Sequence, residues 1–376
     1  MKILKKIWSI ISVKYKKMAI TIFILSILAT ALETLGIGLV VPTITLLIDD
    51  NIFDKYPLLL KVSVYFGNPS QSKLIISGAV FLVLVFIIKS IFLAFFAWRQ
   101  SNFIYGIKAD LSHKLFKKYL NLPYEFHLER NSSHLIRNLT SEINQFSGNV
   151  IGSILILANE VFVVFALISL LFYFEPFGAI IILTIASLAM FSFQFITKSR
   201  LKAWGEKRQK HEGFKIQKAQ EGLSGTKDLK LMGKENYFVE NFDIHNFNNA
   251  LIEIKQSTLS QIPRLWLETV GVVCIGIIIS ISAYFSNTTK EVIPIIAVFA
   301  AAAFRIFPSS NRILSSLQSL KYASVVTNLV YKELNQQDIR TYKNTPIKFK
   351  QNINLDNISY MYPNSSKYAL SSINLT

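Results

Sequence analysis

The sequence predicts an all-α polytopic membrane protein with six long transmembrane helices and intracellular extensions, followed by an incomplete β-hairpin at the C-terminus. Three observations predict this fold class. The 376 residues are 51% hydrophobic and only 17% charged, with a mean hydropathy of +0.39, whereas soluble domains carry about 25% charged residues. Apolar runs of membrane-spanning length alternate with basic connections, and a strand-like pattern begins near the C-terminus.

Six apolar runs each approach the length of about 20 residues that a helix needs to cross about 30 Å of hydrocarbon. They are residues 18–48, 74–98, 146–174, 177–196, 265–285 and 292–307. The first follows a lysine-rich start and contains Ala29-Thr30-Ala31, which mimics the cleavage site of a secretory signal. Because apolar residues continue to Ile48, we expect a retained span. Arg305 and Pro308 cut the last run short.

The formal net charge of +17 is distributed unevenly along the chain. Residues 1–17 hold six lysines and no acid, and the connections 108–142 and 198–255 are strongly basic, whereas 49–73 and 175–176 have no basic excess. Because basic connections face the cytoplasm, we predict that both termini and both basic connections are cytoplasmic. Six spans exclude a soluble nucleic-acid-binding protein, and the lysine-rich segment 198–218 is expected to be a solvated helix face near anionic headgroups.

The two basic connections have the pattern of helices rather than loops. Residues 99–119 and 198–220 contain scarcely any glycine or proline, and Ile107, Leu111 and Leu115 recur at helical spacing. The spans are therefore predicted to continue well beyond the membrane. Each pair of extensions meets at a short turn, Asn121-Leu122-Pro123 in the first and Gly222-Leu223-Ser224-Gly225 in the second.

The C-terminal residues have a different character from the spans. Residues 339–350 form a polar linker, and Leu355, Ile358 and Tyr360 begin a strand pattern that a turn at 363–366 separates from a second strand at 368–375. Because an isolated hairpin is at best marginally stable, residues 351–376 are expected to be the first strands of a further soluble domain that the chain does not complete.

Three stretches in this order are similar to those of one transporter family. They are Leu122-Pro123-Tyr124-Glu125-Phe126-His127, Gly222-Leu223-Ser224-Gly225-Thr226-Lys227-Asp228-Leu229-Lys230 and Ile358-Ser359-Tyr360-Met361-Tyr362-Pro363. With six spans, the chain resembles the membrane half of an ABC exporter, covering residues 1–338, followed by the entry to its nucleotide-binding domain. The resemblance implies a homodimer that switches between inward and outward access, with ATP and Mg²⁺ bound in the full-length protein.

The resemblance also implies roles for individual residues. Two turns would transmit motion from the nucleotide-binding domain to the spans, and the residue after the first strand would stack on adenine. The coupling residues are Tyr124, Glu125, Phe126, Thr226, Lys227 and Asp228, and the stacking residue is Tyr362. No Gly-x-x-x-x-Gly-Lys-Ser/Thr occurs in the 376 residues, so this chain is expected to bind no nucleotide phosphate and not to hydrolyse ATP as given.

Among the exporters, the chain is most similar to flippases of lipid-linked oligosaccharides. The outer segment 50–68 looks like the short amphipathic helix of that group between its first two spans, and the Asn131-Ser132-Ser133 stretch points the same way. One departure from the exporter family is His134, where a small residue is common. The implied location is a bacterial inner membrane, and the implied cargo is an amphipathic lipid with a polar head.

Ionisable residues at membrane depth are costly and tend to face cavities or partners. The candidates for a substrate pathway are Glu33, Lys89, Glu160, Arg264, Arg305 and Arg312. Arg305 and Arg312 lie two turns apart on one helix face, where guanidinium groups suit a pyrophosphate. The competing interpretation is pairing of charges within the protein, for example Glu33 or Glu160 with Lys89, or Arg264 with Glu268 at i,i+4.

Other functions remain open at this level. Export of peptides, drugs or unglycosylated lipids uses the same spans, and a non-catalytic receptor or assembly protein with a transporter-like bundle would account for the missing phosphate loop. A metal site is not expected, because the five histidines lack ligand spacing and Cys274 is the single cysteine. Outside the resemblance, Tyr362 is an ordinary strand aromatic.

Overall fold

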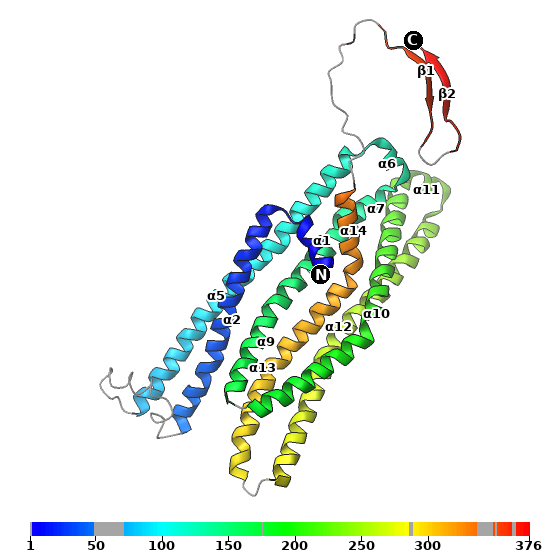
Figure 1. The fold of residues 1–376 in the computed structure, drawn as a ribbon. Helices are drawn as coiled ribbons and strands as arrows, with labels where there is room; N and C mark the ends of the chain where they lie inside the picture. Colours follow the sequence, from blue (N-terminus) through cyan, green and yellow to red (C-terminus); the bar gives the residue numbers. More distant parts are fainter. Residues whose placement is uncertain are drawn as a thin grey trace.

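The computed structural model describes residues 2–48, 71–174, 176–285, 289–336, 349, 352–362 and 366–376. It is an elongated bundle of long helices (Figure 1). The long helices are α2 (Val13–Ile48), α5 (Gln71–Asn121), α9 (Ser153–Phe174), α10 (Pro176–Ser224), α12 (Glu235–Phe285) and α13 (Thr289–Tyr322). Every predicted span lies within this set or, for residues 146–152, in the helical turn before α9. As predicted, several helices continue far beyond the apolar runs.

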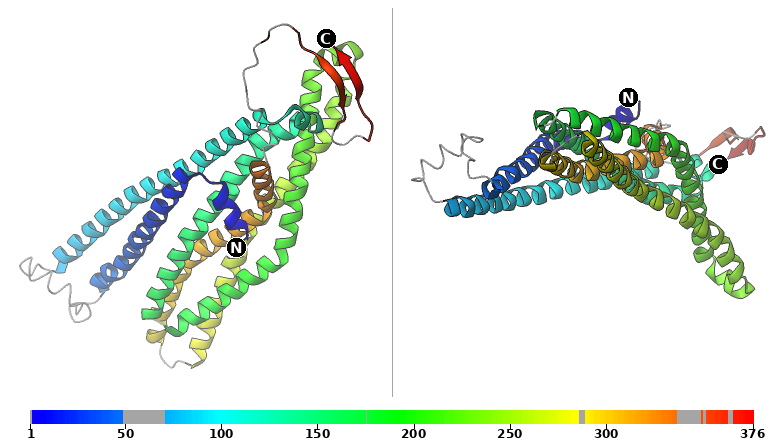
Figure 2. Two further views of the ribbon diagram at one scale, coloured as in Figure 1. Left: turned by 45° about the horizontal axis from the view of Figure 1, so that its top comes forward. Right: turned by 90° about the horizontal axis from the view of Figure 1, so that it is seen from below.

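The long helices pack in two groups. Helix α2 packs along α5, α10 packs along α12, and α13 packs between α9, α10 and α12. Figure 2 shows the α2–α5 pair diverging from the other long helices at the end where α2 stops and α5 begins. Among the described residues, three helical segments are long and apolar enough to cross a membrane, namely Val13–Gly36, Ile75–Asn121 and Ser132–Ala166.

The largest apolar core is centred on the extensions and reaches into the spans at Ile22 and Phe96. The predicted stripe Ile107, Leu111 and Leu115 is almost completely buried, and it packs with Phe146 and Val330. By contrast, large apolar side chains along the first half of α5, such as Phe81 and Ile91, are exposed. This inversion fits a helix whose first half faces lipid and whose second half packs in water.

Short helices close the far end of the bundle. Helix α6 (Tyr124–Glu129) starts after Pro123, and α7 (Ser132–Arg137) starts where the Asn131 side chain accepts a hydrogen bond from the Ser133 backbone N–H at 3.0 Å. Helix α11 (Thr226–Met232) ends at Gly233, whose φ of 62° is left-handed. The predicted turn at 121–123 is confirmed between α5 and α6, whereas α10 continues to Ser224 and leaves only Gly225 before α11. Figure 1 shows the short helices α6 and α11 at one end of the bundle.

The segment between α7 and α9 is helical with two wide turns. Asn138–Glu142 (η1) and Phe146–Gly152 (η2) are π-helical, separated by α8 (Ile143–Gln145). Such turns interrupt α-helices at the cost of poorer hydrogen bonding and are often found at functional sites. The sequence carries no proline or other signal that predicts them.

Two elements flank the bundle in sequence. Helix α1 (Lys2–Ile10) packs on α14 (Ser324–Asn335), which follows α13. At the C-terminus, β1 (Leu355–Tyr360) pairs antiparallel with β2 (Leu370–Leu375), with Ile358 opposite Ile373. These are the two predicted strands. The predicted outer helix at 50–68, nearly all of the linker 339–350 and most of the turn at 363–366 lie outside the described residues.

The close contact between α10 and the end of α13 depends on one glycine. A Cβ added at Gly205 would overlap the backbone carbonyl oxygen of Tyr322. We expect Gly205→Ala to lower the free energy of unfolding by about 1–3 kcal/mol, because the obstacle is backbone that has to move. Gly148→Ala is the matched control, since nothing lies within 4 Å of its added Cβ. Equal thermal stability of the two variants in detergent would contradict this packing.

Candidate functional site

The predicted coupling residues lie on two short helices, with their side chains pointing in different directions. On α6 the ring of Tyr124 is 73% exposed, whereas Phe126 stacks on Tyr119 with ring centroids 6.0 Å apart and lies under the Arg130 guanidinium. On α11, Thr226, Lys227 and Asp228 are exposed. Tyr124 and the α11 residues are therefore available to a partner, and Phe126 anchors α6 to the bundle.

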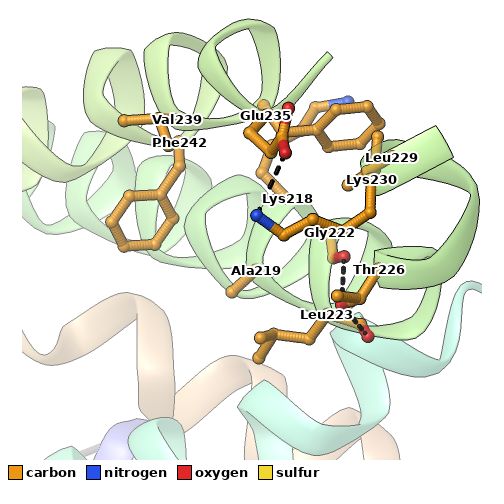
Figure 3. A pocket seen from close by; sticks show the side chains of 11 residues that line it. Lys218, Ala219, Gly222, Leu223, Thr226, Leu229, Lys230, Glu235, Val239 and Phe242 are labelled. Carbon is orange, nitrogen blue, oxygen red and sulfur yellow. Dashed lines mark hydrogen bonds and ion pairs between the residues drawn. The ribbon is translucent and has the colours of Figure 1, made fainter. Parts of the chain in front are cut away.

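A cavity of about 270 Å³ lies beneath α11, between the ends of α10 and α12 (Figure 3). Its lining is mostly apolar and includes Leu229, Phe238 and Phe242. At its edge Lys230 pairs with Glu235 at 3.1 Å, and the Thr226 hydroxyl donates to the Leu223 carbonyl at 2.8 Å. An ion pair and a hydrogen bond therefore hold α11 at the edge of a loosely packed apolar cavity.

A buried carboxylate joins the two basic connections. Glu142, in η1, is completely buried, and its two oxygens each accept a hydrogen bond of 3.0 Å from Nη2 of Arg208 in α10. Gln209 donates a further hydrogen bond of 3.2 Å to Oε2 of Glu142. Nε of Arg137 lies 3.8 Å from Oε1 of Glu142. A buried charge is tolerated only when paired and hydrogen-bonded in this way.

The hydrogen bonds around Glu142 and Arg137 continue through further side chains to α14. Arg137 donates to the Asn138 side-chain oxygen at 3.0 Å, Asn138 donates to the Tyr119 hydroxyl at 3.1 Å, and Tyr119 donates to Glu333 at 3.1 Å. Arg130, between α6 and α7, pairs with the other oxygen of Glu333 at 2.8 Å. Burial raises the pKa of Tyr119, so its hydroxyl remains a donor at neutral pH. We call these residues, from Arg208 to Arg130, the polar chain.

The polar chain was not predicted from the sequence. The segment 198–218 was expected to be a solvated helix face, and Arg208 is an exception because its side chain is only 3% exposed. The partners Glu142 and Arg208 are 66 residues apart, and their pairing has no local signature. A helical projection that placed Arg208 on the apolar side of α10 would have been the available signal.

The candidate pathway charges fall into different environments. Glu160 in α9 is almost completely buried and pairs with Arg312 in α13. Nε of Arg312 lies 2.6 Å from Oε1 of Glu160. Glu160 therefore has a different partner from the suggested Lys89. Arg264 forms the expected pair with Glu268 in its own helix, at 2.8 Å with both side chains largely exposed.

The remaining pathway candidates are only partly described. Lys89 lies 4.0 Å from the centroid of the Phe86 ring, and a Cβ at Gly36 would be 3.4 Å from its Nζ, which places Lys89 against α2. Glu33 is half-buried on α2. Arg305 is in α13, but its side chain lies outside the described part of the chain. The structure thus brings Glu160 and Arg312 together, two of the six candidates.

Tyr362 follows β1 and is 46% exposed, with its ring edge-on to Tyr360 at 5.0 Å. An exposed aromatic ring of this kind suits stacking on a base. No glycine-rich phosphate loop occurs in the 376 residues. The contact of Tyr362 with adenine therefore stays a prediction.

Two histidines face each other between α10 and α12. The Nδ1 atoms of His211 and His245 are 3.2 Å apart, and His245 stacks on Phe214. Within the described ranges, no three histidine, cysteine or acidic side chains group as metal ligands. Burial, reinforced by nearby lysines and for His211 by His245, lowers both pKa values below their usual value.

We therefore expect acid to weaken the α10–α12 contact. Because the folded-state pKa of each histidine is lowered, the unfolded chain binds more protons below about pH 6.5, and stability falls as the pH decreases through that value. Thermal unfolding at pH 7.5 and 5.5 measures this loss, which His211→Gln/His245→Gln should reduce. The control is His113→Gln, which removes an exposed histidine. A pH dependence unchanged by the double substitution would contradict the assignment.

The comparisons with known proteins agree with this architecture. The protein-family model for the ABC transporter transmembrane region matches residues 19–307. The ATP-dependent lipid A-core flippase of Alkalilimnicola ehrlichii is 23% identical over 269 residues, which is 71% of this chain and 45% of that protein. The Bacillus subtilis subtilin transport ATP-binding protein SpaT is 21% identical over 284 residues, covering 74% of this chain and 46% of its own length.

A solved structure extends the likeness to the whole fold. The structure of a bacterial Atm1-family ABC exporter with ATP bound superposes with a TM-score of 0.69 at 12% identity, covering 96% of this chain and 61% of the other. The chain spans about half the length of the curated relatives it matches. Because the family model covers most of the chain, this multi-pass membrane protein belongs to the ABC transporter family, of which it contains the transmembrane region.

Proposed function

We propose that the chain is the membrane half of an ATP-driven flippase or exporter that works as a homodimer. The observation that carries the proposal is the pair of helices α6 and α11 at one end of the bundle, with exposed Tyr124, Thr226, Lys227 and Asp228. Nucleotide-binding domains docked there would move α6 and α11 when ATP binds. The polar chain would pass this motion to α5, α10 and α14.

The proposed cargo is an amphipathic lipid with a phosphorylated or saccharide head. The support is that several relatives are lipid A-core flippases, among them one from Pseudoalteromonas atlantica at 21% identity over 80% of this chain and 51% of that protein. Arg305 and Arg312 on α13 are the proposed head-group contacts. Arg312 uses Nε and Nη2 for Glu160 and remains 44% exposed, so it still presents charge to a phosphate.

The proposed setting is a bacterial inner membrane with the N-terminus and the α6–α11 end in the cytoplasm, supported by the lysine-rich start and the positive-inside rule. ATP and Mg²⁺ would be bound by nucleotide-binding domains, with Tyr362 stacking on adenine. A second candidate cargo is a peptide, which the likeness to the subtilin transport protein favours.

The test is reconstitution of the gene product that carries this chain into proteoliposomes. We expect ATP-dependent movement of a fluorescent lipid with a pyrophosphate–saccharide head, and none with a neutral lipid or a peptide of similar size. ATP-dependent movement of the peptide alone would favour the second candidate. No ATP-dependent movement of any cargo would contradict the proposal and favour a receptor or assembly role.

Arg305 gives the proposal a single-residue test. Arg305→Ala should slow ATP-dependent movement of the pyrophosphate lipid about 10- to 100-fold, because one charge-assisted hydrogen bond contributes about 1.5–3 kcal/mol. Arg264→Ala is the matched control, since Arg264 is exposed and already paired within its own helix. Unchanged transport by Arg305→Ala would remove Arg305 from the pathway.

A further inference from the structure

Helix α1 has three distinct faces. Ile7 and Ile10 are buried against the rest of the protein, while Leu4 and Trp8 are 57% and 50% exposed on a neighbouring face. Lys5 lies on the remaining, polar side and is exposed. A short helix with an apolar side that its own protein leaves uncovered, next to a basic side, is the arrangement of an interfacial helix.

The short distance in sequence between α1 and the first span indicates how deep α1 lies in the membrane. The apolar run of α2 begins at Met18, directly after Lys14, Lys16 and Lys17, and lysines at the end of a span lie at headgroup level. Helix α1 ends only four residues before Lys14. Leu4 and Trp8 are therefore at the depth of the headgroups and upper acyl chains, where tryptophan is enriched.

The lysines of this region are not neutralised by the protein. Lys6 donates to the Asn328 side chain of α14 at 2.7 Å and lies 5.2 Å from the Tyr331 ring centroid, and Lys16 lies 5.5 Å from the Trp8 ring centroid. In the described residues, none of the ion pairs involves Lys5, Lys14, Lys16 or Lys17. These positive charges are therefore available to an anion from outside the chain.

We propose that Lys5, Lys14, Lys16 and Lys17 around Trp8, here called the basic anchor, bind headgroups of anionic phospholipids in the cytoplasmic leaflet. Trp8 and Leu4 would contact the acyl chains, and the lysines would contact the phosphates. A zwitterionic headgroup satisfies the same apolar contact but adds no net negative charge, so the preference for anionic lipid comes from the lysines. Bound lipid would also hold α1 against α14, through Ile7, Ile10 and Lys6.

The experiment uses Trp8 as its own reporter. Trp98, Trp204, Trp266 and any tryptophan of the gene product outside these 376 residues are replaced by phenylalanine, which leaves Trp8 as the single tryptophan. This protein is placed in phosphatidylcholine nanodiscs. A minor, equal fraction of either phosphatidylglycerol or phosphatidylcholine with brominated chains is then added. We expect brominated phosphatidylglycerol to quench Trp8 fluorescence at least about threefold more strongly than brominated phosphatidylcholine, with the difference decreasing at high salt.

A matched pair of triple variants isolates the charge. Lys5→Gln/Lys14→Gln/Lys17→Gln should abolish the preference, while Lys117→Gln/Lys227→Gln/Lys234→Gln, which removes three exposed lysines elsewhere, should preserve it. Circular dichroism confirms that both variants are folded. Equal quenching by the two brominated lipids, a preference that survives loss of the anchor lysines, or no quenching by either lipid would each overturn the proposal. None of these outcomes depends on transport activity.

Discussion

Glu142→Ala is expected to lower the free energy of unfolding by about 3–5 kcal/mol, one of the two largest effects that the structure predicts. The substitution leaves Arg208, which is only 3% exposed, without its bidentate partner, and it also removes the carboxylate near Arg137. Breaking a buried ion pair by removing one partner is costly because the other charge stays buried and uncompensated. The loss should spread to the contact between η1 and α10.

Thermal or denaturant unfolding in nanodiscs measures the effect, and a matched variant separates it from general loss of charge. Glu206→Ala removes a carboxylate two residues before Arg208. Because Glu206 is exposed and its ion pair with Lys202 is long, at 3.8 Å, we expect the free energy of unfolding to change by less than about 1 kcal/mol. The Glu142→Ala/Arg208→Ala double variant should cost less than the sum of the single variants. Similar behaviour of Glu142→Ala and Glu206→Ala would refute the polar chain.

Arg312→Gln is expected to have two separable effects. It leaves Glu160, which is almost buried, without its 2.6 Å partner, so the free energy of unfolding should fall by about 1–3 kcal/mol. It also removes a charge that we propose contacts the head group. In proteoliposomes, ATP-dependent movement of a pyrophosphate lipid should therefore fall together with stability.

Neutralising the partner as well distinguishes the two effects. In Glu160→Gln/Arg312→Gln the buried carboxylate is gone, so no buried charge is left uncompensated. We expect stability to recover in the double variant while transport stays low. Recovery of transport together with stability would show that Arg312 acts only as the partner of Glu160 and would remove it from the proposed pathway.

The sequence was sufficient for the features that repeat along a helix. The stripe Ile107, Leu111 and Leu115 predicted the buried face of α5, and the turns predicted at 121–123 and 222–225 directly precede α6 and α11. Lysines before Met18 and the long apolar runs predicted the spans. Each of these signals is local, because burial with a period of 3.6 residues or a turn residue is visible in a short window.

The sequence was insufficient for features that depend on which helices meet. Glu160 has several basic residues as possible partners in the spans, and only the packing of α9 on α13 selects Arg312. The pair Glu142–Arg208 likewise requires η1 to pack on α10, and η1 itself is π-helical without a sequence signal. Phe126 belongs to a motif with exposed Tyr124, yet packing on Tyr119 turns it inward.

The most direct test of the account is the distance between two copies of the chain during the nucleotide cycle. In the full gene product, Cys274 and any cysteine outside these 376 residues are replaced by serine, and the exposed Lys117 near the end of α5 is replaced by cysteine and spin-labelled. Pulsed electron paramagnetic resonance in nanodiscs then measures the distance between the labels of two protomers. We predict a well-defined distance without nucleotide that shortens clearly when ATP is trapped with vanadate. A distribution that shows no pair of labels, or that does not change with ATP, would contradict a homodimer driven through α6 and α11.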